Sequence, residues 1–302
     1  MSTAVPERDW WYVRAYPGGP GRMDAAVRTL VPWLAAQAER LGSEEWFFLR
    51  YWDATGHHLR LRLRAGAAAV DALDGAARAE LAGLLETLEE RPEDTAGLLP
   101  GTLPEGSPAR GVVPAVYAPE LAKYGGREGV AVAERIFRLD SAFCADLDLA
   151  GLPRRHERAA HAVAFARALT ARVLPAQERD VFWVRHRTRW GWQLRLAAAG
   201  EPLRPLLAGL AAGVREQGAP PPEVRERIEA HADEVAGLLL RAPGPLPHQL
   251  LHHLHMVMNR LGFPPGEEAA LGMLAGQAAG RPAAAAGAVS SASASVSVSV
   301  SG

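Results

Sequence analysis

Lysine and cysteine are almost absent from this 302-residue sequence. Of its 33 basic residues, Lys123 is the single lysine and the others are arginines. We interpret this first as a compositional bias that accompanies the many Ala, Gly and Pro residues, which makes the retained lysine an exception. The single cysteine, Cys144, excludes an intramolecular disulfide framework and a cysteine-based metal site. Its apolar neighbours favour a buried small residue over a nucleophile.

Several further features are missing, and each absence excludes a class of function. No apolar run approaches the length of a membrane span, and the first ten residues lack the apolar core of a signal peptide. The net charge of -1 gives no overall basic field for nucleic acid or anionic membranes. Nucleotide-binding loops and a serine nucleophile elbow are also missing. We therefore predict a cytoplasmic protein with no cofactor and no direct nucleic-acid or membrane partner.

Strand patterns are concentrated in the front half of the chain. Residues 9–17 are rich in aromatics and predict a strand, and residues 23–41 have helical spacing. Residues 45–53 and 58–64, joined by a short connection containing Gly, predict a β-hairpin. A further strand is predicted over 115–120.

Helical patterns dominate the rest of the chain. We predict helices over residues 67–90, 129–147, 156–173, 201–217, 222–240, 247–261 and 266–278. Residues 179–196 fit either a helix or a strand.

The resulting fold class is α+β, with a small mixed or antiparallel sheet in the N-terminal half packed against a mainly helical C-terminal half. We predict a single domain over residues 1–280, with its sheet-containing part at about 9–125 and its helical part at about 126–280. The Ser/Val-rich residues 281–302 are predicted to be a disordered low-complexity tail outside the fold.

The stretch HHLRLRLR places three arginines on one side of an extended chain. Its leucines fall on one face, and Arg60, Arg62, Arg64 and His58 fall on the other. An exposed edge strand decorated with charges accounts for this pattern. The alternative is an anion clamp, because the neighbouring run WFFLRYWD is apolar on both faces and therefore predicts an interior strand beside the arginines. Arginine in such an aromatic-walled recess binds carboxylate or phosphate bidentately.

A second candidate anion site lies around residues 120–126. Lys123 and Tyr124 precede Gly125-Gly126 at the start of a predicted helix, where amide groups can bind an anion. A simple glycine turn with Glu120 paired to Lys123 is the alternative.

Histidines recur along the predicted helix over 247–261. His248, His252, His255 and Asn259 form one stripe, and His253 lies off it and is predicted to face solvent. No nearby acidic residue completes a metal ligand set, so we predict no metal. One of the histidines acting as a general acid or base fits imidazole chemistry near pH 7.

Four segments in order carry a family resemblance. They are WWYVRAYPGGPGRMDAAVRTLVPWL, EWFFLRYWDATGHHLRLRLR, VYAPELAKYGGREGVAVAERIFRLDS and LLHHLHMVMNRLG. Together they resemble the lanthipeptide dehydratase C-terminal domain, whose stand-alone members are called thiopeptide-type bacteriocin biosynthesis proteins. The resemblance covers about Trp10 to Leu261, and the combination is specific although each motif alone is not.

The resemblance implies chemistry on a ribosomal peptide. In the larger class I dehydratases, a separate domain or subunit esterifies Ser or Thr of a precursor peptide with glutamate from glutamyl-tRNA. The elimination domain then removes the α-proton and expels glutamate, which leaves dehydroalanine or dehydrobutyrine. A related branch instead joins two dehydroalanines in a formal cycloaddition that forms a pyridine ring and releases the leader peptide.

The resemblance also assigns residue roles. Arg60 and Arg62 match the arginines that hold the glutamyl adduct in eliminating members, and His255 matches the family's acid/base histidine. Lys123 stands where the family has arginine, so it keeps the positive charge but lacks the bidentate fork. Further expectations cover substrate binding by Arg50, Tyr124 and Asn259, and support of the site by Tyr124, Glu134 and Asp140.

We therefore predict a lyase that eliminates glutamate from a glutamylated peptide. The expected partners are the modified precursor peptide and a separate glutamyl-tRNA-dependent peptide glutamylation subunit, because no segment here is long enough to glutamylate. A homodimer is left open. The alternatives are a thiopeptide pyridine synthase, which the Lys123 departure favours, and a non-catalytic partner subunit, which an exposed arginine face would favour.

Overall fold

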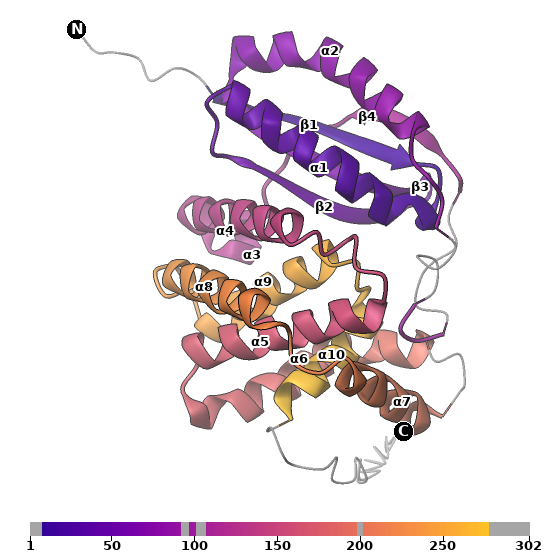
Figure 1. The fold of residues 1–302 in the computed structure, drawn as a ribbon. Coiled ribbons are helices and arrows are strands. Elements are labelled where there is room, and N and C mark those ends of the chain that lie inside the picture. Colours follow the sequence, from indigo (N-terminus) through magenta and orange to yellow (C-terminus); the bar gives the residue numbers. More distant parts are fainter. Residues whose placement is uncertain (1–7, 92–96, 101–106, 198–201, 278–302) are drawn as a thin grey trace, which may run out of the picture.

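The computed structural model describes residues 8–91, 97–100, 107–197 and 202–277. The tail predicted over 281–302 lies outside these ranges. Within them, a sheet layer stands above a larger layer of helices, as the α+β prediction requires (Figure 1).

The sheet has four antiparallel strands in the order β2-β3-β1-β4. Their bounds are β1 Arg8–Pro17, β2 Trp46–Asp53, β3 Gly56–Gly66 and β4 Arg110–Pro114. The predicted hairpin is confirmed: β2 and β3 pair in register down to Asp53 opposite Gly56. Gly56 has φ +134, and a Cβ there would meet the Ser107 carbonyl oxygen at 2.5 Å, so the tight turn needs glycine.

The described helices follow the predicted pattern closely. They are α1 Met23–Arg40, α2 Ala67–Glu86, α3 Leu121–Tyr124, α4 Gly126–Asp146, α5 Arg155–Val173, α6 Ala176–Ala197, α7 Leu203–Glu216, α8 Pro222–Leu239, α9 Leu246–Arg260 and α10 Pro265–Gly276, with a short 3-10 turn η1 over Pro20–Arg22. The ambiguous segment is the helix α6, whose residues Phe182, His186, Trp190 and Leu194 are buried at four-residue spacing.

The strand predicted over 115–120 is wrong. The fourth strand ends at Pro114, and residues 115–120 form a loop. Ala115 still donates its N–H to the Tyr12 carbonyl, but Pro119 has no N–H with which to continue a ladder.

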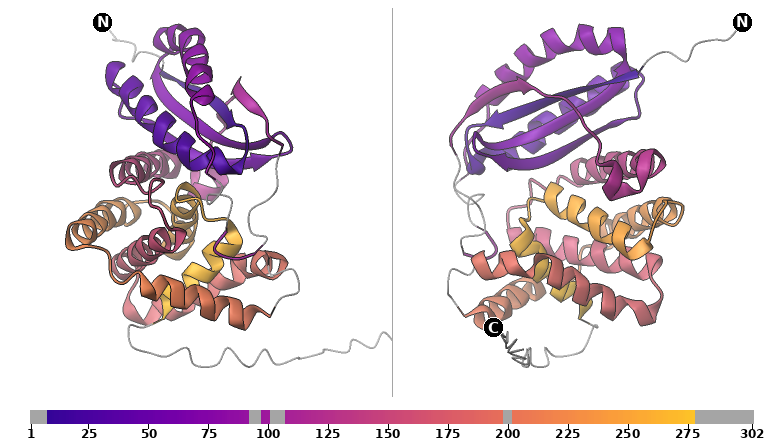
Figure 2. Two further views of the ribbon diagram at one scale, coloured as in Figure 1. Left: turned by 45° about the vertical axis from the view of Figure 1, so that its right-hand side comes forward. Right: turned by 180° about the vertical axis from the view of Figure 1, so that it is seen from behind.

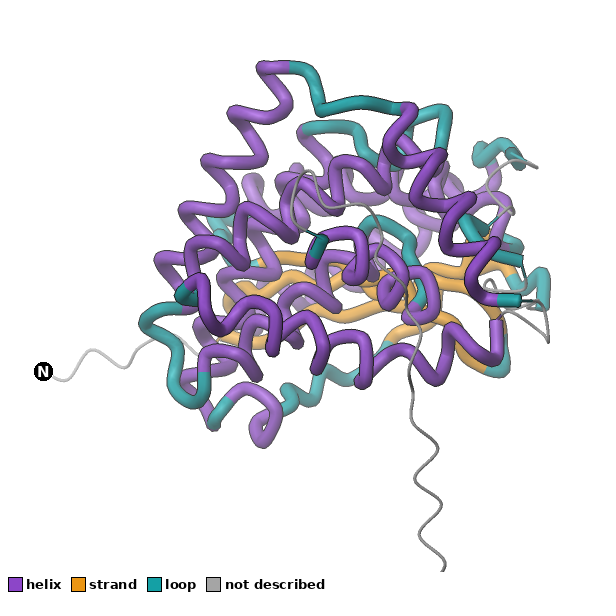
Figure 3. The backbone as a smooth tube through the Cα atoms, turned by 90° about the horizontal axis from the view of Figure 1, so that it is seen from below, coloured by secondary structure: helices purple, strands orange, loops and turns teal. Residues whose placement is uncertain are grey.

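Helices cover both faces of the sheet. The helices α1 and α2 lie on one face, while α3 and α4 lie between the other face and the remaining helices (Figures 1 and 2). In the view from below, the strands run behind the helices of the helical layer (Figure 3). The predicted alternation of β3 is confirmed, because Leu59, Leu61 and Leu63 are fully buried in the core shared with α1 and α2. The arginine face therefore looks toward the helical layer.

The strand β2 is at the edge of the sheet, and its predicted interior position is wrong. Side chains from two helices cover the edge instead of a further strand. The Asn259 side chain of α9 accepts a hydrogen bond from Arg50 N (3.0 Å) and donates one to Arg50 O (2.7 Å), and Ser141 Oγ of α4 accepts one from Phe48 N (3.2 Å). The edge is thus capped rather than open, which explains how β2 can be apolar on both faces.

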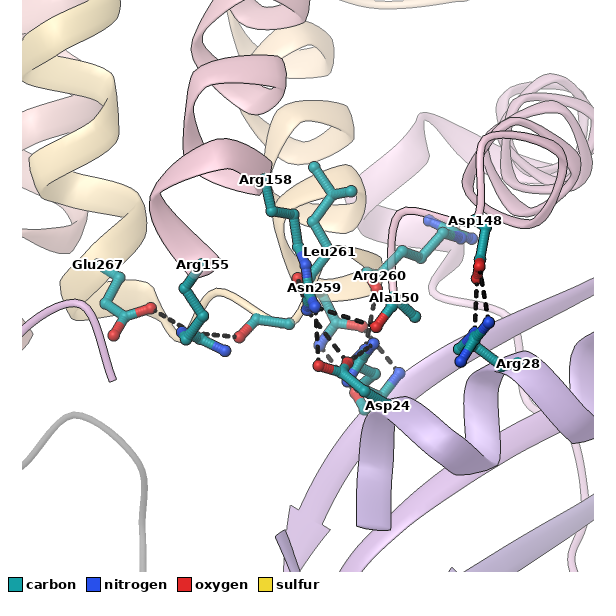
Figure 4. A network of polar contacts seen from close by, with 12 residues as sticks. Asp24, Arg28, Asp148, Ala150, Arg155, Arg158, Asn259, Arg260, Leu261 and Glu267 are labelled. Atoms are coloured by element: carbon teal, nitrogen blue, oxygen red, sulfur yellow. Dashed lines mark hydrogen bonds and ion pairs between the residues drawn. The ribbon is translucent and has the colours of Figure 1, made fainter. Parts of the chain in front are cut away.

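A buried carboxylate on α1 joins the two layers. Asp24 is 3% exposed and receives hydrogen bonds from both terminal guanidinium nitrogens of Arg158 on α5, at 3.1 and 2.8 Å (Figure 4). The Arg50 guanidinium of β2 donates a further hydrogen bond to it. Arg158 also donates to the carbonyls of Leu261 and Ala150. Burial alone would raise the pKa of Asp24, but the charges of the two arginines outweigh it and hold that pKa well below its usual value.

We expect Asp24→Asn to destabilise the fold by about 3–5 kcal/mol, because one charge of a buried network is removed and two arginines lose their partner. The lowered folded-state pKa of Asp24 means that its stabilisation is present above the unfolded pKa, near 4, and is lost as the pH falls. Urea unfolding at several pH values measures both effects. The free energy of unfolding of the variant should lack the decrease at low pH that Asp24 causes.

Asp148→Asn is the matched control, because Asp148 pairs bidentately with Arg28 at the surface, where its side chain is 54% exposed. Its loss should stay within about 1 kcal/mol. Equal destabilisation by the two variants would contradict the role given to Asp24.

Asn259→Leu keeps the approximate size of the side chain and removes both hydrogen bonds to the β2 edge. We expect a loss of roughly 2 kcal/mol in the free energy of unfolding, because a backbone N–H and C=O lose their partners. Denaturant titration measures it, and unchanged stability would show that water replaces the cap.

Candidate functional site

One pocket lies between the arginine face of the sheet and the helices α3, α4 and α9. Its volume is about 260 Å³, just below the roughly 300–1,000 Å³ of typical small-molecule sites. All seven residues predicted for catalysis or substrate binding line it, namely Arg50, Arg60, Arg62, Lys123, Tyr124, Asn259 and His255. The β2–β3 hairpin, α3 and α9, which are distant in sequence, therefore meet at one cavity.

Arg62 is held by aromatic rings. Its guanidinium carbon lies 4.4 Å from the ring centre of Tyr12, 4.7 Å from that of Tyr117 and 5.2 Å from that of Phe47. The residue is 7% exposed, and no carboxylate in the described part of the chain forms an ion pair with it. Burial lowers the pKa of Arg62, since desolvation disfavours its charge. Cation–π contacts position the group but leave its N–H donors available to an anion.

Arg60 lies beside Arg62 on the same face of β3. Its guanidinium carbon stacks 3.3 Å from the ring centre of Tyr51, and it too has no ion-pair partner among the described residues. Arg64, the third arginine of the row, pairs with Glu45 at 2.9 Å and does not line the pocket. His58 is fully buried, and burial lowers its pKa to about 4. The row therefore divides into two anion-accessible arginines and two neutralised or buried members.

Lys123 enters the pocket from α3. Its Nζ lies 3.0 Å from Glu120 and 5.2 Å from the ring centre of Tyr124. The next residue after Tyr124, Gly125, has φ +82 and lets the chain turn directly from α3 into α4. The Tyr124 hydroxyl is buried without a hydrogen-bond partner in the described part of the chain, and burial raises its pKa, so it remains a phenol donor.

His255 is oriented by a residue that the sequence reasoning missed. Its Nδ1 lies 2.6 Å from Oε2 of Glu268 on α10, whose side chain has no exposure. Burial alone would raise the pKa of Glu268, but the charge of protonated His255, the hydrogen bond from His255 and the nearby His186 lower it. The imidazole also stacks on Trp190 of α6, with ring centres 4.4 Å apart. Since Nδ1 is engaged, Nε2 is the nitrogen left for the pocket.

One further histidine of α9 is placed differently from the prediction. His253, predicted to face solvent, is 1% exposed and packs between Tyr124 and Phe137, because α9 is covered on that side by α3 and α4. Burial lowers its pKa to about 3. His252 has a pKa lowered to about 4 by burial and by Lys123, and His248 contacts the Lys123 carbonyl at 3.1 Å. Among the described residues, no group of three or more ligating side chains could hold a metal.

Arg50 lines the pocket but directs its charge elsewhere. It lies on the same face of the sheet as the leucines of β3, opposite Leu59, and its guanidinium is engaged by Asp24. The side-chain amide of Asn259 is hydrogen-bonded to the backbone of Arg50. Arg50 and Asn259, two of the three residues predicted for substrate binding, thus build the wall of the pocket.

The two supporting carboxylates of the prediction separate in space. Glu134 accepts a hydrogen bond from the Tyr117 hydroxyl at 2.8 Å and so fixes one wall of the ring cluster around Arg62. Burial raises its pKa. Asp140 is buried away from the pocket, 3.0 Å from His231 and 3.6 Å from Arg260.

The pocket combines three kinds of surface. Arg60 and Arg62 supply positive charge, Lys123 adds a cation that is paired with Glu120, and His255 supplies a proton acceptor or donor. An apolar floor completes it, formed by Leu49, Val130, Ala133, Phe137 and Met256. Such a site suits an anionic group carried on a short aliphatic chain, with a base nearby.

Comparisons with known proteins agree on one fold. The family model described as lantibiotic biosynthesis dehydratase C-term matches residues 10–279. A search of curated proteins found no match. Among solved structures, the pyridine synthase TbtD from thiomuracin biosynthesis is 19% identical with a TM-score of 0.59, and the match covers 89% of this chain and 96% of that one.

Two further solved structures have lower TM-scores. The tRNA-dependent lantibiotic dehydratase MibB from Microbispora sp. 107891 is 22% identical with a TM-score of 0.49; the match covers 91% of this chain but only 28% of that longer one. TsrL is 14% identical with a TM-score of 0.47, with 90% and 94% of the two chains covered. Among helices of the described residues, none has the length and apolarity that a membrane span needs.

Proposed function

The chain belongs to the lantibiotic biosynthesis dehydratase C-terminal family, and from that premise we propose that it is a glutamate-elimination lyase. Its substrate would be a ribosomally made precursor peptide whose Ser or Thr carries a glutamyl ester. The product would be dehydroalanine or dehydrobutyrine and free glutamate. The activity is proposed for the cytoplasm, with a separate glutamylating subunit supplying the ester.

The residues of the pocket match the needs of this reaction. A base removes the Cα proton, the electron pair forms the Cα=Cβ bond, and the Cβ–O bond breaks to release glutamate as a carboxylate. His255, held at Nδ1 by Glu268, has Nε2 available for the proton. Arg60, Arg62 and Lys123 would hold the free carboxylate of the glutamyl group and stabilise the negative charge that develops on the leaving carboxylate.

The observation that carries the proposal is the pair of arginines without carboxylate partners. Arg62 is 7% exposed and is held by rings, so the pocket keeps a desolvated positive charge for which the described residues provide no counter-ion. A glutamyl group supplies that counter-ion, and its methylenes fit the apolar floor. The convergence of the β2–β3 hairpin, α3 and α9 on one cavity supports a catalytic role over that of a non-catalytic partner subunit.

Incubation with a peptide bearing a glutamylated Ser should release one glutamate per site, which mass spectrometry detects. Arg62→Met keeps much of the aliphatic stem but loses the charge, and we expect the elimination rate to fall about 10²–10³-fold, as when a stabilising donor is removed from a developing charge.

Arg64→Met is the matched control. It removes a neighbouring charge from the same strand and face, but Arg64 pairs with Glu45 outside the pocket. Its rate should stay within a few-fold of the unchanged protein. A persistent adduct with the unchanged protein, or full elimination by Arg62→Met combined with His255→Ala, would sink the proposal.

A second candidate is thiopeptide pyridine synthase. The shared fold with TbtD extends over 96% of that chain, and Lys123 replaces the arginine of eliminating relatives. A synthase joins two dehydroalanines and has no carboxylate leaving group, so it has less use for Arg62.

A peptide with two dehydroalanines and its leader decides between the candidates. Our proposal predicts no loss of leader from it and no pyridine absorbance. Pyridine formation with leader release, together with no glutamate loss from the glutamylated peptide, would replace the elimination assignment.

A further inference from the structure

The two oxygens of Glu268 are shared between two imidazoles. Oε2 lies 2.6 Å from His255 Nδ1, and Oε1 lies 3.3 Å from His186 Nε2. The side chain of Glu268 has no exposure and that of His186 has 1%. A carboxylate removed from water is costly unless groups of opposite polarity face both oxygens. The contact with His186 is not a hydrogen bond in the described part of the chain, so the second histidine faces Oε1 as a nearby group of opposite polarity.

The helix α6 provides both neighbours of this unit. His186 faces Glu268, and Trp190, one turn further along the same helix, stacks on the His255 ring at an interplanar angle of 19°. Both α6 side chains lie on its buried stripe. One helix face thus contacts the carboxylate and the imidazole of the pair together.

The His186 ring is packed tightly between side chains of α6 and the backbone of α10. Trp183 meets it edge-on with ring centres 5.4 Å apart. Gly272, one turn after Glu268 on α10, lies against the other side, where a Cβ would overlap the imidazole. Neither ring nitrogen of His186 has a hydrogen-bond partner in the described part of the chain, and Nε2 has only the 3.3 Å contact with Glu268. An apolar residue would fill this space without burying an unsatisfied nitrogen, so packing alone does not account for histidine here.

We propose that His186 and Trp190 are positioning residues for His255. His186 fixes the Glu268 carboxylate so that Oε2 accepts the Nδ1–H of His255, and Trp190 fixes the plane of the ring. Together they keep Nε2 unprotonated and directed at the pocket in the neutral imidazole. The effect on rate rests on the proposed elimination activity, but the orientation of His255 is measurable without turnover.

Nitrogen-15 NMR of histidine-labelled protein tests the orientation directly. The chain has ten histidines, and comparison with His255→Gln identifies the signals of His255. In the unchanged protein we expect a single Nδ1–H tautomer with a strongly deshielded, slowly exchanging Nδ1 proton. In His186→Leu that proton signal should broaden or disappear, and Nε2–H should become populated.

His186→Gln is the conservative variant, because its side-chain amide can place an N–H near the position of the imidazole Nε2. It should restore the Nδ1–H signal. If elimination occurs as proposed, His186→Leu should lower kcat about 10–100-fold with little change in KM, as loss of a group that orients a catalytic ligand does, and His186→Gln should recover most of it.

Trp192→Leu is the matched control on the same helix, since Trp192 is 57% exposed and lies outside the buried stripe. It should change neither the tautomer nor the rate. If His186→Leu does not fold, as judged by circular dichroism, the pair Trp190→Leu and Trp190→Phe replaces it. Only Trp190→Leu should then abolish the ring-current shift of the His255 ring protons and the deshielded signal.

An unchanged His255 tautomer in folded His186→Leu or Trp190→Leu overturns the positioning role. Absence of elimination by the unchanged protein, with the NMR changes as expected, overturns the proposed function and leaves the positioning role standing. The two failures are therefore distinguishable.

Discussion

The buried contact of Asp24 with Arg50 and Arg158 is the constraint on which the site depends. It ties α1 and β2 of the sheet layer to α5 of the helical layer with charges that cannot reach water. The pocket is built across that same junction, because Arg60 and Arg62 come from the sheet and His255 comes from α9. Breaking a buried ion pair costs several kcal/mol, so the two halves of the site are kept in one arrangement.

The arginines of the protein show two opposite uses of one side chain. Arg50 and Arg158 are neutralised by an internal carboxylate and hold the layers together. Arg62 is buried to a similar degree, but its neighbours are rings, which attract the cation without consuming its N–H donors. The first arrangement favours rigidity and the second favours an anion from outside. Internal pairing rather than burial distinguishes the structural arginines from those proposed to bind substrate.

Much of the fold could be predicted because periodicity is a local property. The Leu/Arg alternation of β3 and the hairpin follow directly from neighbouring residues. The edge position of β2 could not, because Asn259, which caps it, lies more than two hundred residues away. Family motifs identified Arg60, Arg62, Lys123 and His255 in the sequence, and all four line one pocket in the structure. Glu268 and Trp190 carry no motif of their own, and only the packing of α6 and α10 around α9 brings them to His255.

The position of Asn259 has a consequence for how this architecture can vary. It lies one turn after His255, so the residue that caps the sheet edge and the residue that faces the pocket share one stripe of α9. Insertion of a single residue between them would rotate one against the other by about 100°. The helix could then keep either the Asn259 hydrogen bonds to β2 or the orientation of His255 toward the pocket, but not both. The four-residue spacing therefore couples the protection of the sheet edge to the orientation of His255, and changes of loop length elsewhere do not affect it.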